Sequence, residues 1–262
     1  MSGVKGRVAL VTGAGSHNGI GMACAQALAA AGARVAITST TKRINDRVEE
    51  LRCKEGDKLA VIADLTKATD VKRLIEETKR ALGPIDIVVN NAGEAPSAPF
   101  DKTDAELWSR VIAVDLTGVF LVTRAVLADL KARGTGARVI NIASTAGLSG
   151  YAYVSAYCAA KHGVIGLTRA LALELAKTGV TVNAVCPGFT DTPLLRKAAE
   201  TIKAKTGRSE ADALTTLAGA NPQGRLVTPQ EVADTVLWLA SPGSASINGQ
   251  AIVVAGGEVM AG

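Results

Sequence analysis

Three side chains in this sequence have the types and the spacing to move a proton to and from a substrate oxygen. Tyr157 and Lys161 are four residues apart near the start of a predicted helix, so they share one face of it. Ser144 ends the preceding predicted strand. A tyrosine has a reference pKa of about 10, and a nearby ammonium group favours its phenolate. We therefore expect Tyr157 to act as acid or base, Lys161 to supply the charge, and Ser144 to hydrogen-bond the substrate oxygen.

A glycine-rich turn near the N-terminus has the position of a dinucleotide site. The apolar run 7–11 leads straight into TGAGSHNGIG at residues 12–21, and an amphipathic run follows. Glycines let the backbone approach a pyrophosphate, and the N–H groups at the start of a helix bind it. The alternative is a glycine-rich turn without a ligand. The predicted cofactor contacts in this turn are Gly13, Gly15, Ser16, Asn18, Gly19 and Ile20.

The end of the second predicted strand indicates which nicotinamide cofactor binds. An NAD enzyme places an acidic residue there, against the ribose 2′-hydroxyl. This chain instead has TSTTKR at residues 38–43, where hydroxyls and two cations suit a 2′-phosphate. We favour NADP(H), with NAD(H) left open, and expect contacts from Ser39, Thr40 and Lys42. The alternative is that Lys42 and Arg43 only begin a solvated helix.

Short apolar runs alternate with longer amphipathic runs along the whole chain, and no linker divides it. This alternation predicts an α/β fold: a single-domain, Rossmann-type, doubly wound parallel sheet of about seven strands with helices on both faces, spanning residues 1–262. The predicted strands are residues 7–11, 34–38, 59–62, 85–89, 139–142, 181–185 and 251–254, and the predicted helices are residues 19–31, 43–53, 68–82, 104–132, 155–177 and 229–239.

Two of these helices, residues 104–132 and 155–177, are apolar over most of their circumference. Such a helix needs cover on every side, which one face of a sheet does not supply. We therefore predict a subunit interface on these helices and a homotetramer. The alternative is that a neighbouring helix of the same chain covers them.

Composition argues against several other classes of protein. The formal net charge of +5 comes from basic residues that are spread along the chain, so no nucleic acid partner is expected. The four cysteines form no CxxC pair and no Cys/His cluster, so no metal site is expected. Residues 1–7 are too short and polar for a signal peptide, and the longest apolar runs are strand-length or broken by charge. These features predict a cytoplasmic protein with no membrane span.

The motifs, taken in order, resemble the short-chain dehydrogenase/reductase family. Residues 90–93, NNAG, resemble the motif that shapes the floor of that family's cofactor cleft, and Pro187-Gly188 resembles the motif beside the nicotinamide. The stretch 156–188 is most similar to 3-oxoacyl and polyketide ketoreductases. The resemblance implies further cofactor contacts at Asp64, Leu65, Asn91, Ala92, Gly93, Tyr157, Lys161, Pro187, Gly188, Thr190 and Thr192.

The chain departs from the family pattern at two places. The glycine loop is two residues longer around His17 and Asn18, so we expect it to bulge, with His17 facing solvent. Asp115 stands where the family has a fourth catalytic residue, an Asn whose main-chain carbonyl holds a water behind the lysine. One hypothesis is that only this carbonyl matters; the other is that the carboxylate pairs with Lys161 and raises its pKa. We favour the first, because a charge several ångströms away in contact with water is screened.

These observations predict an NADP(H)-dependent oxidoreductase that reduces a ketone of 3-oxoacyl type, with a helical substrate lid at residues 190–224. An NAD-dependent dehydrogenase of secondary alcohols is the main alternative. A redox sensor that binds the dinucleotide without turnover is more remote, because both Tyr157 and Lys161 are present. An isomerase or dehydratase is remote as well, because such relatives have a different lid and a longer C-terminal region.

Overall fold

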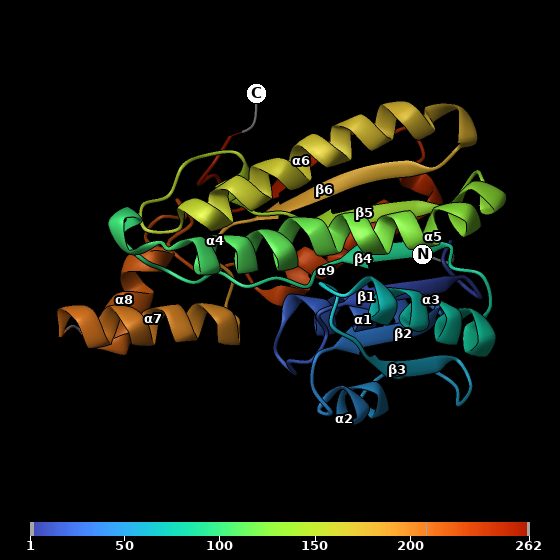
Figure 1. Cartoon of the computed structure of the whole chain (residues 1–262), viewed down its shortest axis with the longest axis horizontal. Coiled ribbons are helices and arrows are strands. Elements are labelled where there is room, and N and C mark those ends of the chain that lie inside the picture. Colours follow the sequence, from blue (N-terminus) through green and yellow to red (C-terminus); the bar gives the residue numbers. More distant parts are fainter. Residues whose placement is uncertain (1–2, 208, 261–262) are drawn as a thin grey trace.

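Seven parallel strands form one sheet in the order β3-β2-β1-β4-β5-β6-β7 (Figure 1). The computed structural model describes residues 3–207 and 209–260, without the side chains at 202 and 204–206. The order reverses between β1 and β4, which is where doubly wound sheets bind their ligands. The predicted fold is confirmed. The strands are β1 (Val8–Thr12), β2 (Arg34–Ser39), β3 (Lys58–Ile62), β4 (Ile87–Asn90), β5 (Arg138–Ile142), β6 (Thr181–Pro187) and β7 (Ala251–Val254).

Helices cover both faces of the sheet. One face packs against α1, α2 and α9, and the other packs against α3, α5 and α6. Figure 1 shows α4, α5 and α6 running across the front of the sheet. The helices are α1 (Ile20–Ala30), α2 (Ile44–Glu49), α3 (Ala68–Leu82), α4 (Ala105–Ile112), the π-helical turn η2 (Ala113–Thr117), α5 (Gly118–Arg133), α6 (Ser155–Leu175), α7 (Pro193–Thr206), α8 (Glu210–Ala218) and α9 (Pro229–Ala240), with short 3₁₀ turns η1 (Phe100–Lys102), η3 (Thr145–Gly147), η4 (Ala176–Thr178) and η5 (Pro242–Ser244).

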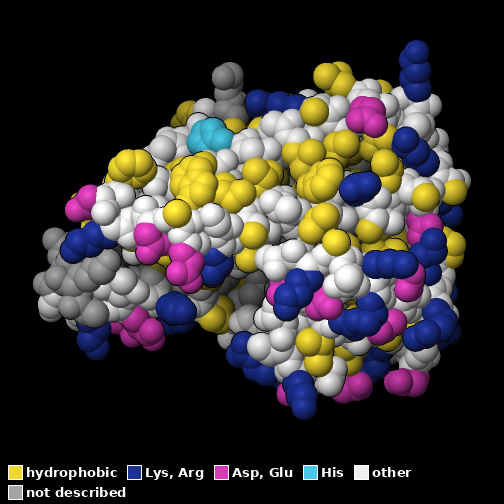
Figure 2. Space-filling view, in the orientation of Figure 1, with side chains coloured by type: hydrophobic (Ala, Val, Ile, Leu, Met, Phe, Trp, Pro, Cys, Tyr) yellow, Lys and Arg dark blue, Asp and Glu magenta, His cyan; other side chains and the backbone are white. Residues whose placement is uncertain are grey.

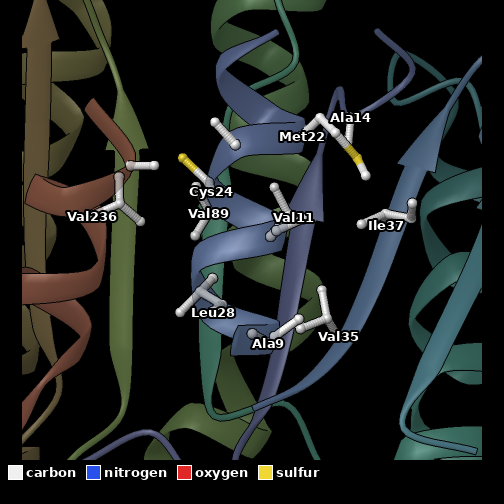
Figure 3. Close-up of a cluster of buried hydrophobic side chains, with 14 of the residues drawn as sticks. Ala9, Val11, Ala14, Met22, Cys24, Leu28, Val35, Ile37, Val89 and Val236 are labelled. Atoms are coloured by element: carbon white, nitrogen blue, oxygen red, sulfur yellow. The ribbon is translucent and has the colours of Figure 1, made fainter. Parts of the chain in front are cut away.

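The central strand β1 explains why both faces are covered. Successive side chains of a strand point to opposite faces, and all of β1 is buried. Ala9 and Val11 belong to the cluster that includes α1 and α9, shown in Figure 3. Val8 and Leu10 belong to the cluster on the other face, with α3 and α5. A strand that is apolar in both directions is the signature of a parallel sheet between two helical layers.

Two buried arginines fasten α9 to the sheet. Nη1 of Arg7 donates to the Ala240 carbonyl at 2.9 Å. Nε of Arg138 donates to the Leu239 carbonyl at 3.1 Å, and its Nη2 donates to the Ser241 carbonyl at 3.3 Å. Burial and the neighbouring Arg138 lower the pKa of Arg7 to about 10. The last carbonyls of a helix have no partner within the helix, so these guanidinium groups act as its C-terminal cap.

The rod formed by α4, η2 and α5 corresponds to the helix predicted over residues 104–132. Helix runs without a break over Ala105–Arg133, and by length and composition alone it could cross a membrane. Asp115 interrupts the apolar run of this segment in the sequence, and the helix continues through that charged position. The core helix of a folded protein passes the same test, and this rod packs against α3 and α6. Its outer side keeps hydrophobic side chains exposed, including Trp108 and Phe120, and Figure 2 shows such side chains gathered over α4 and α5.

Replacing Arg138 with methionine tests the role of the buried arginines. Arg138→Met keeps the bulk of the side chain but removes its hydrogen bonds to the Leu239 and Ser241 carbonyls. We expect the free energy of unfolding to fall by about 2–4 kcal/mol, measured by urea denaturation. Arg80→Met, at an exposed position on α3, is the matched control and should change it little. Equal stabilities of the two variants would show that these hydrogen bonds do not hold α9.

Candidate active site

The carboxyl ends of the central strands bring the predicted catalytic residues together. Ser144 follows β5, and its hydroxyl accepts a hydrogen bond from the Ala146 N–H at 3.1 Å, which starts the turn η3. Tyr157 and Lys161 lie in the first two turns of α6, which packs directly against η3. Gly147 allows this close packing, because a Cβ there would lie 2.7 Å from the Lys161 carbonyl oxygen. The geometry therefore unites the three residues that the sequence singled out.

Tyr157 is half-buried, and its ring centroid lies 5.4 Å from Nζ of Lys161. Burial raises the pKa of Tyr157, while the Lys161 ammonium and the Ser144 hydroxyl lower it and Asp115 raises it further. The contribution of Lys161 has the sign that we expected. The net shift of the Tyr157 pKa is upward, opposite to that contribution, because the cost of burying a phenolate exceeds the attraction of the ammonium. In this environment Tyr157 holds its proton firmly.

Lys161 is buried, and two groups hold its ammonium group. Its Nζ donates to the Ile142 carbonyl at 3.1 Å and lies 3.3 Å from Oδ2 of Asp115. Burial alone would lower the pKa of Lys161, yet the carboxylate of Asp115 and the oxygen of Tyr157 raise it above its ordinary value. The lysine therefore carries its positive charge beside the phenol.

The position of Asp115 contradicts the premise of the hypothesis that we favoured, namely that water screens its charge from Lys161. Its side chain is 0 % exposed in the turn η2, where water does not screen it. One carboxylate oxygen accepts from the Glu94 N–H at 2.9 Å, and the other forms the ion pair with Lys161. A Cβ at position 93 would lie 2.7 Å from Oδ2 of Asp115, so Gly93 gives the carboxylate its room. Water does not screen the Asp115 charge, because the packing of helices from distant parts of the chain buries it, and the local sequence does not reveal that packing.

The start of the glycine loop is clamped by the NNAG stretch. Nδ2 of Asn91 donates to the carbonyls of Thr12 and Gly13 at 2.9 and 3.1 Å. Oγ1 of Thr12 accepts from the N–H groups of Asn91 and Ala92 at 2.9 and 3.0 Å. Gly13 has a φ of +69°, which favours glycine. Thr12 was not among the predicted site residues; its place directly before the glycines was the only signal for it.

The residues predicted to receive the adenosine end lie along the edges of β2 and β3. A Cβ at Gly15 would touch Ser39, so the loop and the end of β2 are in contact. Lys42 and Arg43 are exposed just before α2, a position consistent both with phosphate binding and with the start of a solvated helix. Oδ1 of Asp64 accepts from Thr66 at 2.7 and 3.0 Å, and these hydrogen bonds lower the pKa of Asp64.

The two additional loop residues lie beside the base of the predicted lid. His17 is largely exposed, as expected, and its Nδ1 lies 2.6 Å from Oε2 of Glu50. His17 and Asn18 line one side of a pocket of about 380 Å³, and Asp191 and Arg196 line the other. The longer loop therefore reaches α2 and the start of α7 together.

The stretch after β6 begins the segment 190–224, which contains α7 and α8; residue 208 lies outside the described residues. The Gly188 N–H donates to the Val254 carbonyl at 3.0 Å. Oγ1 of Thr190 donates to the Gly188 carbonyl at 2.9 Å, and Oγ1 of Thr192 accepts from the Leu195 N–H at 3.3 Å, which caps α7. Both threonines are buried, so they fix the path from the sheet edge to α7.

Comparisons with known proteins agree with this geometry. A family model described as Enoyl-(Acyl carrier protein) reductase matches residues 13–258. A "Putative ketoacyl reductase" of Streptomyces coelicolor is 40 % identical over 260 residues, covering 98 % of both chains. A "D-beta-hydroxybutyrate dehydrogenase" of Cupriavidus necator is 38 % identical, covering 98 % of this chain and 99 % of that one.

A solved structure is also similar to this fold. The F189W variant of actinorhodin polyketide ketoreductase, crystallised with NADPH, superposes with a TM-score of 0.90 at 39 % identity, covering 96 % of this chain and 97 % of that one. Sequence, fold and the Ser144-Tyr157-Lys161 arrangement thus lead to one conclusion: the chain is an oxidoreductase that belongs to the short-chain dehydrogenase/reductase family.

Proposed function

We propose that this protein uses NADPH to reduce a ketone of 3-oxoacyl type to a secondary alcohol. The observation that carries the proposal is the arrangement of Tyr157 beside a buried, charged Lys161 at the carboxyl edge of the sheet. The relatives named ketoacyl reductase and the NADPH complex of a polyketide ketoreductase support both the substrate class and the cofactor.

The start of α1 fits a dinucleotide pyrophosphate. Its N-cap, Gly19, provides no side-chain cap, so the first N–H groups of an 11-residue helix keep their hydrogen-bonding capacity. By contrast, Asp104, Thr192 and Thr228 cap their own helices with side-chain oxygens. The glycine loop beside Gly19 provides the close backbone approach that a pyrophosphate needs. We assign the cofactor phosphates to this helix start.

Each catalytic side chain then has a separate task in ketone reduction. Bound NADPH supplies the hydride that adds to the carbonyl carbon. Ser144 hydrogen-bonds the carbonyl oxygen and holds it near the phenol of Tyr157. Tyr157 gives its proton to that oxygen, and the charge of Lys161 stabilises the phenolate that remains. The raised pKa of Tyr157 keeps the proton in place until the oxygen gains negative charge.

A second function, oxidation of secondary alcohols, is favoured by two of the relatives. They are named D-beta-hydroxybutyrate dehydrogenase and cis-4-hydroxycyclohexanecarboxylate dehydrogenase. The same residues serve this direction with Tyr157 as the base. Cofactor preference discriminates the two functions, because the end of β2 lacks the acidic residue that an NAD enzyme uses.

We further propose that the protein works as a homotetramer in the cytoplasm. The exposed Trp108 and Phe120 on the rod of α4, η2 and α5 provide an apolar surface for a second copy of the chain. The four cysteines are unpaired, and burial raises the pKa of the Cys24 thiol to about 12 and that of Cys186 to about 11. Four unpaired cysteines, two of them with buried thiols, suit a reducing compartment.

Tyr157→Phe tests the proposed proton donor. The variant loses only the phenol oxygen, so we expect kcat for reduction of 3-oxo esters to fall by about 10²- to 10⁴-fold while NADPH still binds. Turnover is followed by the absorbance of NADPH, and binding by calorimetry. A kcat within a few-fold of the wild-type value would contradict the assignment.

Ser39→Asp tests the proposed cofactor preference. The wild-type protein should bind NADPH more tightly than NADH, by a ratio that falls as salt rises, because salt screens a contact between a phosphate and cations. The added carboxylate should repel the 2′-phosphate and reduce this ratio by about ten-fold or more. Ser246→Asp, which adds the same charge in the exposed loop after η5, should leave the ratio unchanged. Equal affinities of the wild type for both cofactors at low salt would refute the preference.

Asp115→Asn tests the effect of the ion pair on the phenol. The carboxylate of Asp115 raises the pKa of Tyr157, so its removal should lower that pKa. Alcohol oxidation needs the phenolate, and the rise of its rate with pH should therefore move to lower pH. Asp234→Asn removes an exposed carboxylate from α9 and is the matched control. Superimposable pH–rate profiles of the wild type and Asp115→Asn would mean that the main-chain carbonyl alone matters.

Phe120→Glu tests the proposed assembly. A charge in the middle of the apolar surface should break the contact between copies of the chain. We expect the wild-type protein to sediment as a tetramer at micromolar concentration and the variant as a smaller species. Phe100→Glu, which replaces an exposed ring outside the rod, is the control. A monomeric wild-type protein would show that the rod needs no partner.

A further inference from the structure

Glu258 follows β7 and returns over the carboxyl ends of β5 and β6. Its Oε1 accepts a short hydrogen bond from the Tyr151 hydroxyl. The same hydroxyl lies 3.0 Å from Oγ1 of Thr145. These contacts tie the end of the chain to the loop between β5 and α6.

This contact is next to the catalytic residues. Thr145 follows Ser144 directly in the chain, so the pair of Tyr151 and Glu258 borders the turn that positions the Ser144 hydroxyl. On the opposite side, a Cβ at Gly188 would overlap Oε2 of Glu258, so the carboxylate lies against the turn after β6. The ring of Phe189 packs edge-on against Tyr151, with 6.0 Å between centroids. The carboxylate thus lies between the two turns that border the proposed substrate position.

The second carboxylate oxygen of Glu258 can still accept hydrogen bonds. Oε2 of Glu258 is buried, and no residue among 3–207 and 209–260 with a described side chain donates a hydrogen bond to it. No lysine or arginine in that part of the chain forms an ion pair with Glu258. Leaving a buried carboxylate oxygen unpaired is costly, so an oxygen in this state calls for a donor. A carboxylate accepts hydrogen bonds and attracts cations, and it disfavours carbonyl oxygens.

We propose that Glu258, held by Tyr151, forms a subsite for a hydrogen-bond donor of the substrate, a hydroxyl group or a protonated amine, while Ser144 and Tyr157 hold the ketone. This inference rests on the proposed ketoreductase function and narrows its substrate to a ketone with a second, donor-bearing group. Glu258 determines specificity and takes no part in proton transfer.

The protonation of the Tyr151 hydroxyl supports separate roles for the two carboxylate oxygens of Glu258. Burial, together with the Glu258 carboxylate, raises the pKa of Tyr151 to about 12. The Tyr151 hydroxyl therefore keeps its proton and serves as a fixed donor to Oε1. With Oε1 satisfied in this way, Oε2 is the oxygen left for the substrate.

A set of 3-oxo esters whose chains end in a methyl, a hydroxyl or an ammonium group tests the subsite. The wild-type protein with NADPH should favour the hydroxyl and ammonium ends over the methyl end by about ten-fold or more in kcat/KM. Glu258→Gln keeps the shape but removes the charge, so it should abolish the preference for ammonium and leave kcat for the methyl-ended ester within about two-fold. Glu76→Gln, an exposed position on α3, controls for the lost charge.

Tyr151→Phe distinguishes recognition from a merely structural role. Removing the Tyr151 hydroxyl frees Oε1, so the preference for the ammonium end should persist or grow, opposite to the effect of Glu258→Gln. If both variants slow all three esters equally, or if Glu258→Gln keeps the wild-type preference, the subsite is disproved.

Calorimetry of the three esters without cofactor separates this inference from the proposed function. Absence of turnover of every ester by the wild type would count against the ketoreductase function alone. Tighter binding of the ammonium-ended ester, lost in Glu258→Gln, would still support the subsite. Equal binding of all three esters would overturn it.

Discussion

The buried ion pair between Lys161 and Asp115 is the interaction on which the rest of the candidate site depends. Both side chains are nearly inaccessible, at 4 % and 0 % exposed, and burying an isolated charge costs several kcal/mol. The pair is tolerated because each partner has a further hydrogen bond, Lys161 to the Ile142 carbonyl and Asp115 to the Glu94 N–H. Loss of either partner would strand the other charge. Together these contacts hold the ammonium at one place, 5.4 Å from the centre of the Tyr157 ring.

Two local features, the π-helical turn η2 and Gly93, make room for the ion pair of Lys161 and Asp115. The π-helical turn η2 joins α4 to α5 within the rod and carries Asp115; π-turns often occur at functional sites. Gly93 lets the carboxylate approach where any larger residue would collide with it. The same stretch, residues 90–93, also supplies Asn91, which clamps the glycine loop. One short turn after β4 therefore positions both the loop proposed to hold the cofactor and the charge behind Tyr157.

The fold could be predicted because its signals are local and periodic. All seven strands were predicted within two residues at each end, since each is a short apolar run between helical patterns, and α3 was predicted at its observed bounds. The turn η2 and the ion pair could not be predicted, because they arise where helices from distant parts of the chain pack together. Asp115 was recognised as a departure, but its burial is invisible in the sequence. Glu258 was missed for the same reason: only the folded chain brings it to Tyr151, 107 positions away.

The most direct test of the ion pair is the titration of the Lys161 ammonium group. Lysine labelled with ¹⁵N would report it by NMR, with the signal assigned by its loss in Lys161→Arg. The wild-type protein should keep this ammonium charged beyond pH 10.5, the ordinary lysine value, and Asp115→Asn should lower its pKa. A Lys161 signal that loses its proton near neutral pH in the wild type would contradict the account.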